Sequence, residues 1–310
     1  MNIVLKQFFL LTCAVCSLIN LKAQAPAWHP SPGHTETPIW PGQPPEGKPA
    51  AGPEVDITTS KDPLIAGKPV IRLGNVAIPT MTVYRPKDRN TGAAVVVFPG
   101  GGYQILAIDL EGTEVCDWLT SKGITCVLLK YRVPKSGPYP KSPEALEDAQ
   151  RAVGLVRSHA AEWQVDPHRV GVLGFSAGGH LAAALSTHFD QRLYKPVDAA
   201  DQMSCRPDFA VILYPGYLAL SEQNFALNPD VPVTGQTPPT FLLQTEDDRV
   251  AHVECSLAYY GALKNANVPV EMHLYTEGVH GYGLRRTALP VTAWPQLVET
   301  WLYTIKVLPE

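Results

Sequence analysis

The sequence predicts an α/β fold in which a mostly parallel central sheet carries helices on both faces. From residue 93 onward, short apolar runs alternate with segments of helical periodicity, an order typical of βαβ units. Several of these runs are apolar at every position, as expected for strands that are buried on both faces. The right-handed crossover rule then places helices on both sides of the sheet.

The predicted elements follow one another without an internal repeat or a break that would require a second domain. Two short strands flanked by Gly and Pro come first, over 70–75 and 80–85. Gly123 ends the first predicted helix, and Pro143 suits the first turn of the second. Further strands are expected at 93–98, 124–129, 169–173, 209–213, 240–244 and 270–275, and helices at 111–122, 143–163, 177–189, 252–266 and 293–305.

A secretory signal peptide is predicted over residues 1–25. Lys6 gives a basic start, residues 8–19 form a short apolar core, and Ala23-Gln24-Ala25 supplies small residues at the expected cleavage site. The apolar core is too short for a membrane span. We therefore expect a secreted or periplasmic protein.

Residues 26–69 contain eleven prolines and predict an extended arm before the main domain, residues 70–310. Proline lacks the backbone donor that helices and sheets need. A disordered linker is the alternative, but Trp28, Ile39 and Trp40 favour an arm packed on the body, because solvated linkers rarely carry such residues.

The charge pattern excludes nucleic acid as a partner. The formal net charge is −4, or −6 without Lys6 and Lys22 of the signal segment, and no basic patch is present. Binding to phosphates requires clustered positive charge. The remainder of the chain has no second long apolar stretch, so we expect no membrane span. The sequence does not indicate an oligomeric state.

Four cysteines remain outside the signal segment: Cys116, Cys126, Cys205 and Cys255. An oxidising compartment permits disulfides. Four in roughly 285 residues is not a disulfide framework, and no CxxC or zinc spacing is present. We expect buried free thiols, with disulfides as the alternative.

The pentapeptide Gly174-Phe175-Ser176-Ala177-Gly178 matches G-x-S-x-G between a predicted strand and a predicted helix. This context is typical of a nucleophile elbow, a turn so tight that it strains its serine and needs glycine on either side. We predict that Ser176 is a catalytic nucleophile. The alternative is an ordinary turn in which this serine caps the helix.

A nucleophilic serine needs donors for the negative oxygen of the transition state. The N–H of Ala177 is one candidate. Pro99-Gly100-Gly101-Gly102-Tyr103 follows another buried strand, and we expect a second donor from Gly101 or Gly102, which the sequence does not separate. A flexible or phosphate-binding loop is the alternative, but no GxxxxGK[ST] or GxGxxG pattern follows.

The serine also needs a base and an acid that orients it. His280 lies in a glycine-rich loop after the last predicted strand, whereas the other histidines lie in the arm, on or near helices, or within a strand. The acid is expected after the preceding strand, where we rank Asp248 first, Asp247 second and Glu246 third. We expect the two acidic residues that do not orient the histidine to form a solvated turn.

Six motifs carry a family resemblance: PGGGY, EGTEVCDWL, LLKYRVP, GFSAGGH, QTEDD and GVHGYGLR. With them, residues 39–310 resemble the α/β-hydrolase superfamily, and within it the bacterial acetylxylan esterase-like group of esterases and lipases. Pro99 stands where many members have histidine. The resemblance implies an α/β-hydrolase catalytic domain over 70–310, triad roles for Ser176, Asp248 and His280, and no metal or organic cofactor.

The resemblance also implies removal of acetyl or similar small acyl groups from plant polysaccharide such as xylan. The stretch between Phe189 and Phe209 is too short for a large lid, and an open site suits an acylated oligo- or polysaccharide. Sugar-stacking surfaces are candidates at Tyr103 and Tyr282, and also at Trp40 and Tyr217, with ordinary packing as the alternative for each.

Four other functions compete with this prediction. A general carboxylesterase or lipase and a feruloyl esterase would use the same residues. A serine peptidase related to prolyl oligopeptidase would need an added domain for which the chain has no room. A non-catalytic carbohydrate-binding protein would not need the elbow.

Overall fold

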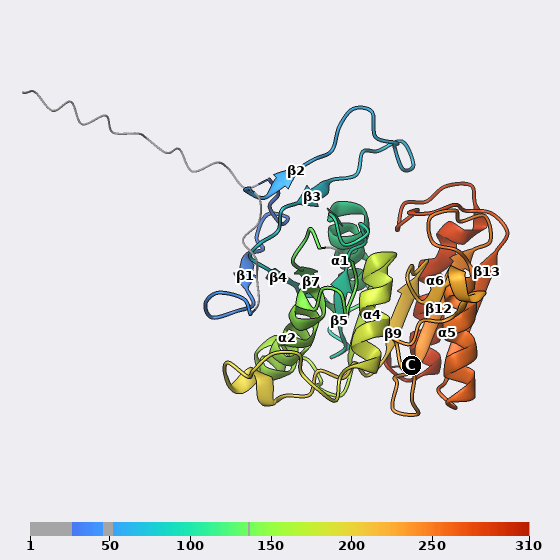
Figure 1. Cartoon of the computed structure of the whole chain (residues 1–310). Coiled ribbons are helices and arrows are strands. Elements are labelled where there is room, and N and C mark those ends of the chain that lie inside the picture. The colour runs from blue at the N-terminus through green and yellow to red at the C-terminus, as the bar shows by residue number, and fades with distance from the viewer. Residues whose placement is uncertain (1–26, 46–51, 136, 310) are drawn as a thin grey trace, which may run out of the picture.

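An eight-stranded sheet forms the centre of the structure, a computed structural model that describes residues 27–45, 52–135 and 137–309 (Figure 1). The strands are ordered β1-β4-β7-β5-β8-β9-β12-β13. β4 is antiparallel to both β1 and β7, and the six strands from β7 to β13 are parallel. The α/β prediction is confirmed.

The predicted elements are found within a few residues of their expected bounds. In sheet order the strands are β1 Glu36–Pro38, β4 Thr80–Tyr84, β7 Thr125–Lys130, β5 Ala94–Phe98, β8 Val170–Phe175, β9 Ala210–Leu213, β12 Thr240–Thr245 and β13 Val270–Tyr275. The helices are α1 Glu114–Ser121, α2 Glu144–Ser158, α3 Ala160–Trp163, α4 Ala177–Thr187, α5 Glu254–Asn265 and α6 Trp294–Thr304.

The predicted helix at 111–122 has a different start. It begins with a π-helical turn, η1, over Asp109–Thr113, and continues as α1. The predicted helix at 143–163 is divided into α2 and α3.

Several short elements were not predicted, because two to four residues carry no readable periodicity. β2 Val55–Asp56 and β6 Leu106–Ala107 pair with β3 Arg72–Gly74, which is the strand predicted at 70–75, to form a small antiparallel sheet, and β10 Ala219–Leu220 pairs with β11 Ala226–Leu227. Short 3₁₀ turns lie at η2 Ala199–Gln202, η3 Ser221–Gln223 and η4 Pro290–Ala293.

The centre of the sheet is buried throughout. Every residue of β5, β7 and β8 is buried, which explains the uninterrupted apolar runs in the sequence. Helices surround the sheet (Figure 1). α1 and α6 meet through Trp118 and Trp294, whose ring centroids are 5.3 Å apart, and α2 packs on α4.

The proline-rich arm is part of the fold. Its strand β1 extends the main sheet by pairing with β4. Its strand β2 pairs with β3 of the main domain, so the arm and the main domain pack together across the boundary at residue 69. Trp28, Ile39 and Trp40 are buried, as expected for an arm packed on the body. Pairing with β1 also covers the backbone groups of β4, which would otherwise form an exposed sheet edge.

The expectation of free thiols is wrong for two cysteines. Cys116 and Cys126 form a disulfide, and Cys205 and Cys255 are free and buried. Cys116 lies on the buried side of α1, and Cys126 lies in β7, the strand that follows this helix. The packing of the helix on its own strand brings the two residues together, which spacing alone did not reveal.

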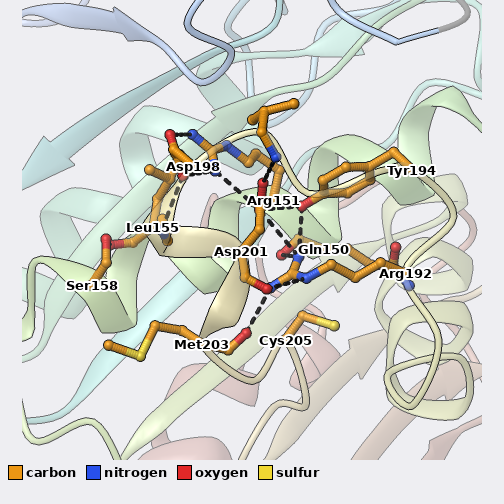
Figure 2. A network of polar contacts seen from close by, with 12 residues as sticks. Gln150, Arg151, Leu155, Ser158, Arg192, Tyr194, Asp198, Asp201, Met203 and Cys205 are labelled. Atoms are coloured by element: carbon orange, nitrogen blue, oxygen red, sulfur yellow. Dashed lines mark hydrogen bonds and ion pairs between the residues drawn. The ribbon is translucent and has the colours of Figure 1, made fainter.

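The segment between α4 and β9 is fixed to α2 by the polar network in Figure 2. Arg151 of α2 pairs with Asp198 and Asp201 and donates to the carbonyl of Ile39 in the arm. Arg192 donates to the hydroxyl of Tyr194 and to the carbonyls of Gln150, Asp201 and Met203. This segment therefore packs against α2 and does not form a lid.

A second buried network joins the arm to the sheet. The carboxylate of Asp148 accepts from Arg132 Nε at 2.9 Å and from Trp40 Nε1 at 2.8 Å. Arg132 also donates to Glu147 and to the carbonyl of Pro45. All the charged groups of this network are buried, so each depends on its partners for compensation.

The predicted signal peptide, residues 1–25, lies outside the described residues. Among the residues that the structure describes, no helix has the length and apolar character that a membrane crossing requires.

We predict that Asp148→Asn lowers the free energy of unfolding by about 3 kcal/mol, because it removes one of the two buried carboxylates that compensate the charge of Arg132. Chemical denaturation checks this. Lys122→Gln is the control, since it breaks the partly exposed 2.8 Å pair with Glu299 and should cost less than about 1 kcal/mol. Equal effects of the two substitutions would contradict the prediction.

Candidate active site

Ser176 lies in the turn between β8 and α4, in a strained backbone conformation. Its φ of 52° and ψ of −117° are outside the regions that non-glycine residues favour, as expected for a nucleophile elbow. Its side chain makes no cap hydrogen bond to α4. Ser176 therefore does not cap the helix through its side chain, which was the alternative.

The flanking glycines allow this turn to form. A Cβ on Gly174 would overlap the carbonyl oxygen of Gly178, and a Cβ on Gly178 would overlap that of Phe98 at the end of β5. Both obstacles are backbone atoms, which cannot rotate away. The first turn of α4 therefore approaches β5 and β8 more closely than any side chain would permit.

The structure brings Ser176, His280 and Asp248 together. The Oγ of Ser176 is 2.9 Å from Nε2 of His280, and Nδ1 of His280 is 2.7 Å from Oδ2 of Asp248. With the imidazole proton on Nδ1, the ring donates to Asp248 and accepts from the serine hydroxyl. This is the hydrogen-bond order of a nucleophile, a base and an orienting acid.

The three acidic residues after β12 have different surroundings. Asp248 is buried, and its Oδ1 accepts from the N–H groups of Val250 and Ala251 at 2.8 and 2.9 Å, while Oδ2 faces His280. Glu246 is exposed. Among the three candidates, Asp248 is the one whose carboxylate contacts the imidazole.

Asp247 instead holds the histidine loop in place. Its carboxylate accepts from the N–H of Val279 at 2.8 Å and from that of Gly278 at 3.2 Å. Burial raises its pKa, but these backbone donors outweigh that effect and keep the pKa below its ordinary value. Thr245 also donates to the carbonyl of Val279 at 2.8 Å, so the residue before His280 is held on both sides.

The glycine loop faces the serine. Gly101 and Gly102 line the same cleft as Ser176 and have positive φ angles of 134° and 62°. Among the described residues, no acceptor is bonded to either of their N–H groups. Ala177 is the first residue of α4, so its N–H has no partner within the helix. All three predicted donors are thus placed beside the serine.

Tyrosines anchor this loop, which has no histidine before its glycines. Tyr131 of the segment after β7 donates to the carbonyl of Pro99 at 2.6 Å. The hydroxyl of Tyr103 is 2.8 Å from Nδ1 of His180 in α4. Burial lowers the pKa of His180 to about 3, which keeps this second histidine neutral and leaves His280 as the base within reach of the serine.

The serine opens into a cleft of about 590 Å³ with a mostly apolar lining. One wall is formed by Pro63 and Ile65 of the arm together with Val70 and Arg72, which directly follow it. Arg285 fixes this wall by donating to the carbonyls of Lys68 and Pro69 and to the carboxylates of Asp109 and Glu114. The arm therefore forms part of the site, which the sequence did not indicate.

A second cavity, of about 650 Å³, lies between the arm and the ends of α1 and α6. None of the predicted site residues lines it.

Three of the four predicted stacking residues are packed inside the protein. Tyr103, Tyr282 and Trp40 are each at most 5% exposed, so their faces are not available to a sugar, and the expectation was wrong for them. Their amphipathic side chains fill the core while the polar atoms of Tyr103 and Trp40 find internal partners. Tyr217 differs, because it is 41% exposed and lines the cleft.

Sequence reasoning missed Glu111 and Tyr214. Glu111 is buried, lines the cleft and accepts from the N–H of Gly100. Tyr214 follows β9, and its ring is 5.0 Å from that of His280. The sequence does not distinguish Glu111 from Asp109 and Glu114 beside it, and the apolar run before Tyr214 gives no sign of a functional residue.

Comparisons with known proteins agree with this geometry. The family model BD-FAE matches residues 81–215. A crystal structure of an acetyl ester-xyloside bifunctional hydrolase from Caldicellulosiruptor lactoaceticus is 34% identical, with a TM-score of 0.71 over 89% of this chain and 97% of that chain.

Two curated relatives are similar over 66% of this chain. They are an acetylxylan esterase of Xylanibacter ruminicola, 30% identical, and the endo-1,4-beta-xylanase B of Butyrivibrio fibrisolvens, 29% identical. The match spans 43% and 34% of their respective lengths, so this chain covers less than half of each.

We predict that Gly178→Ala lowers kcat/KM by roughly 100-fold, because the added methyl pushes α4 away from Phe98 and displaces Ser176 by a fraction of an ångström or more. Initial rates on an aryl acetate check this. Gly261→Ala is the control: its Cβ would meet nothing within 4 Å in α5, and activity should not change. Full activity of the Gly178 variant would contradict the close-packing argument.

Proposed function

The chain belongs to the α/β-hydrolase esterases, and on this premise we propose that it is a serine carboxylic-ester hydrolase that removes acetyl groups from xylan. The observation that carries this proposal is the continuous hydrogen-bond chain from Ser176 through His280 to Asp248 at the floor of an open cleft. Each member of that chain has the role that ester hydrolysis requires.

In the first step the Oγ of Ser176 attacks the ester carbonyl carbon while Nε2 of His280 takes the hydroxyl proton. The carbonyl oxygen becomes an oxyanion, and the N–H groups of Ala177 and of Gly101 or Gly102 stabilise it. His280, now cationic, is stabilised by the carboxylate of Asp248. The tetrahedral intermediate then collapses, His280 protonates the departing sugar oxygen, and an acyl-serine remains.

In the second step water replaces the sugar. His280 removes a proton from the water, whose oxygen attacks the acyl carbon, and the same N–H groups stabilise the second oxyanion. Collapse breaks the bond to the Oγ of Ser176, and His280 returns the proton to that oxygen. The products are the deacylated sugar and the free carboxylic acid, and the triad regains its starting protonation state.

Two observations support an acylated polysaccharide as the substrate. One relative is named an acetylxylan esterase, and one solved structure is titled an acetyl ester-xyloside bifunctional hydrolase. The cleft is open to solvent beside the arm and Tyr217, and the 189–205 segment packs away from it. A decorated polymer chain can therefore approach the serine from outside.

A larger acyl group is the second candidate, and the apolar cleft is the observation that favours it. Ile65, Ile105 and Leu110 line the space around Ser176, which exceeds what an acetyl group fills. Feruloyl esters and longer aliphatic esters would use this space, and the substrate comparison below decides between them and acetyl esters.

We also propose that the protein is exported. The signal pattern of residues 1–25 supports this. The disulfide between Cys116 and Cys126 is in keeping with it, because such bonds persist in oxidising compartments.

Asp248→Asn is expected to lower kcat by roughly 10⁴-fold, since an amide in this position no longer selects the productive imidazole tautomer. Asp247→Asn is the matched control, one residue away. It loses one of two acceptors for the His280 loop, which is worth about 1 kcal/mol and so at most roughly 10-fold in rate. The reverse ranking of the two variants in steady-state kinetics would assign the acid to Asp247.

The direct test of the function is release of acetate from acetylated xylan, compared with feruloylated xylan and a series of aryl esters of increasing acyl length. We expect the acetyl substrates to be hydrolysed fastest and Ser176→Ala to lose at least roughly 10⁴-fold in kcat while remaining folded. A Ser176→Ala variant as active as the wild type would refute the mechanism. Faster hydrolysis of feruloyl esters than of acetyl esters would refute the acetyl specificity and assign feruloyl esters as the substrate.

A further inference from the structure

Glu111 is a buried carboxyl directly behind the glycine loop. It lies in η1, is 4% exposed, and reaches the floor of the cleft that contains Ser176 and His280. Among the ion pairs of the described residues, none includes Glu111. A carboxyl in such a place is costly to bury, and its hydrogen bonds show what it does there.

The two carboxyl oxygens join separate parts of the site. Oε2 accepts from the N–H of Gly100 at 2.7 Å, and Oε1 accepts from the hydroxyl of Tyr214 at 2.8 Å. The Tyr214 oxygen accepts in turn from the N–H of Gly283, at 3.1 Å, in the loop that carries His280. Glu111 therefore joins the loops after β5 and β9 directly, and Tyr214 extends this link to the loop after β13.

The glycine loop is closely packed between Glu111 and Ser176. A Cβ on Gly100 would lie 2.7 Å from Oε2 of Glu111 and 2.9 Å from Cβ of Ser176. Loss of the Glu111 contact on one side would thus free the loop to move relative to the serine on the other. The neighbouring Gly101 and Gly102 would move with it.

We propose that Glu111 is a positioning residue that holds the Gly100–Gly102 loop so that its N–H groups point at the oxyanion. This inference rests on the proposed function. Glu111 holds the loop by accepting from the backbone N–H of Gly100. The role requires only that Oε2 accept a hydrogen bond, which both protonation states of the carboxyl can do.

Burial raises the pKa of Glu111, while Tyr214, the N–H of Gly100 and the His280 side chain lower it and Asp109 raises it. A glutamine at this position keeps one oxygen for Gly100 and offers its NH₂ to the Tyr214 oxygen. An alanine removes both contacts. The two substitutions therefore separate the hydrogen bond from the charge.

The test compares Glu111→Ala and Glu111→Gln in steady-state hydrolysis of p-nitrophenyl acetate. We expect the alanine variant to lose about 100-fold in kcat with KM changed less than about threefold, because the contact matters only when the oxyanion forms. The kcat of Glu111→Gln should be at least about tenfold higher than that of Glu111→Ala. The rate at which a fluorophosphonate labels Ser176 should fall in parallel with kcat.

Asp148→Asn is the matched control, because it also converts a buried carboxylate to an amide but lies outside the cleft. All variants are assayed at a temperature at which circular dichroism shows them folded, and there Asp148→Asn should keep the wild-type kcat. If Glu111→Ala does not fold, Glu111→Gln and Tyr214→Phe are used, and each should lower kcat without a matching change in KM.

Wild-type kcat in a folded Glu111→Ala variant, or in Tyr214→Phe where the alanine variant does not fold, would overturn the inference, and so would a loss confined to KM. An equal loss of kcat in Asp148→Asn would overturn it as well, because the effect would then follow from destabilisation. A wild-type protein that neither hydrolyses p-nitrophenyl acetate nor reacts with the fluorophosphonate would instead refute the proposed function, so the two failures are distinguishable.

Discussion

The close approach of helix α4 to the ends of β5 and β8 is the constraint on which the site depends. Gly174 and Gly178 permit a backbone-to-backbone contact that a single methyl group would prevent. This contact holds Ser176 in its strained conformation, and burial of α4 along its whole length provides the packing that stabilises the strain. If the helix moved outward, the serine would relax and lose its 2.9 Å contact with His280.

The order of the sheet determines which loops meet the serine. β5, β8, β9, β12 and β13 are consecutive neighbours and run parallel, so the segments after them emerge at one edge. Four of these five segments carry a glycine donor, Ser176, Asp248 or His280. Short polar contacts then fix each loop, such as that of Asp247 with Val279 and that of Tyr131 with Pro99. Contacts within the chain thus hold the site residues in place.

The arm gives this chain a feature that its matched family region does not contain. The BD-FAE match begins at residue 81, whereas Ile65, Val70 and Arg72 form a wall of the cleft. Arg285, five residues after His280, anchors that wall through backbone carbonyls. The loop that carries the histidine and the segment that borders the substrate are therefore mechanically linked.

The sequence by itself determined the strands, the helices, the serine elbow and the chain order of Ser176, Asp248 and His280, because these depend on periodicity and on covalent neighbours. The tertiary structure alone decided the pairing of Cys116 with Cys126, the contact of Asp248 instead of Asp247 with His280, the burial of Tyr103 and Tyr282, and the contact of Glu111 with Gly100. Each of these depends on which faces of distant elements pack together. The packing of the whole chain decides these contacts. Even residues adjacent in sequence can have different partners: Asp247 accepts from the N–H of Val279, whereas Asp248 contacts His280.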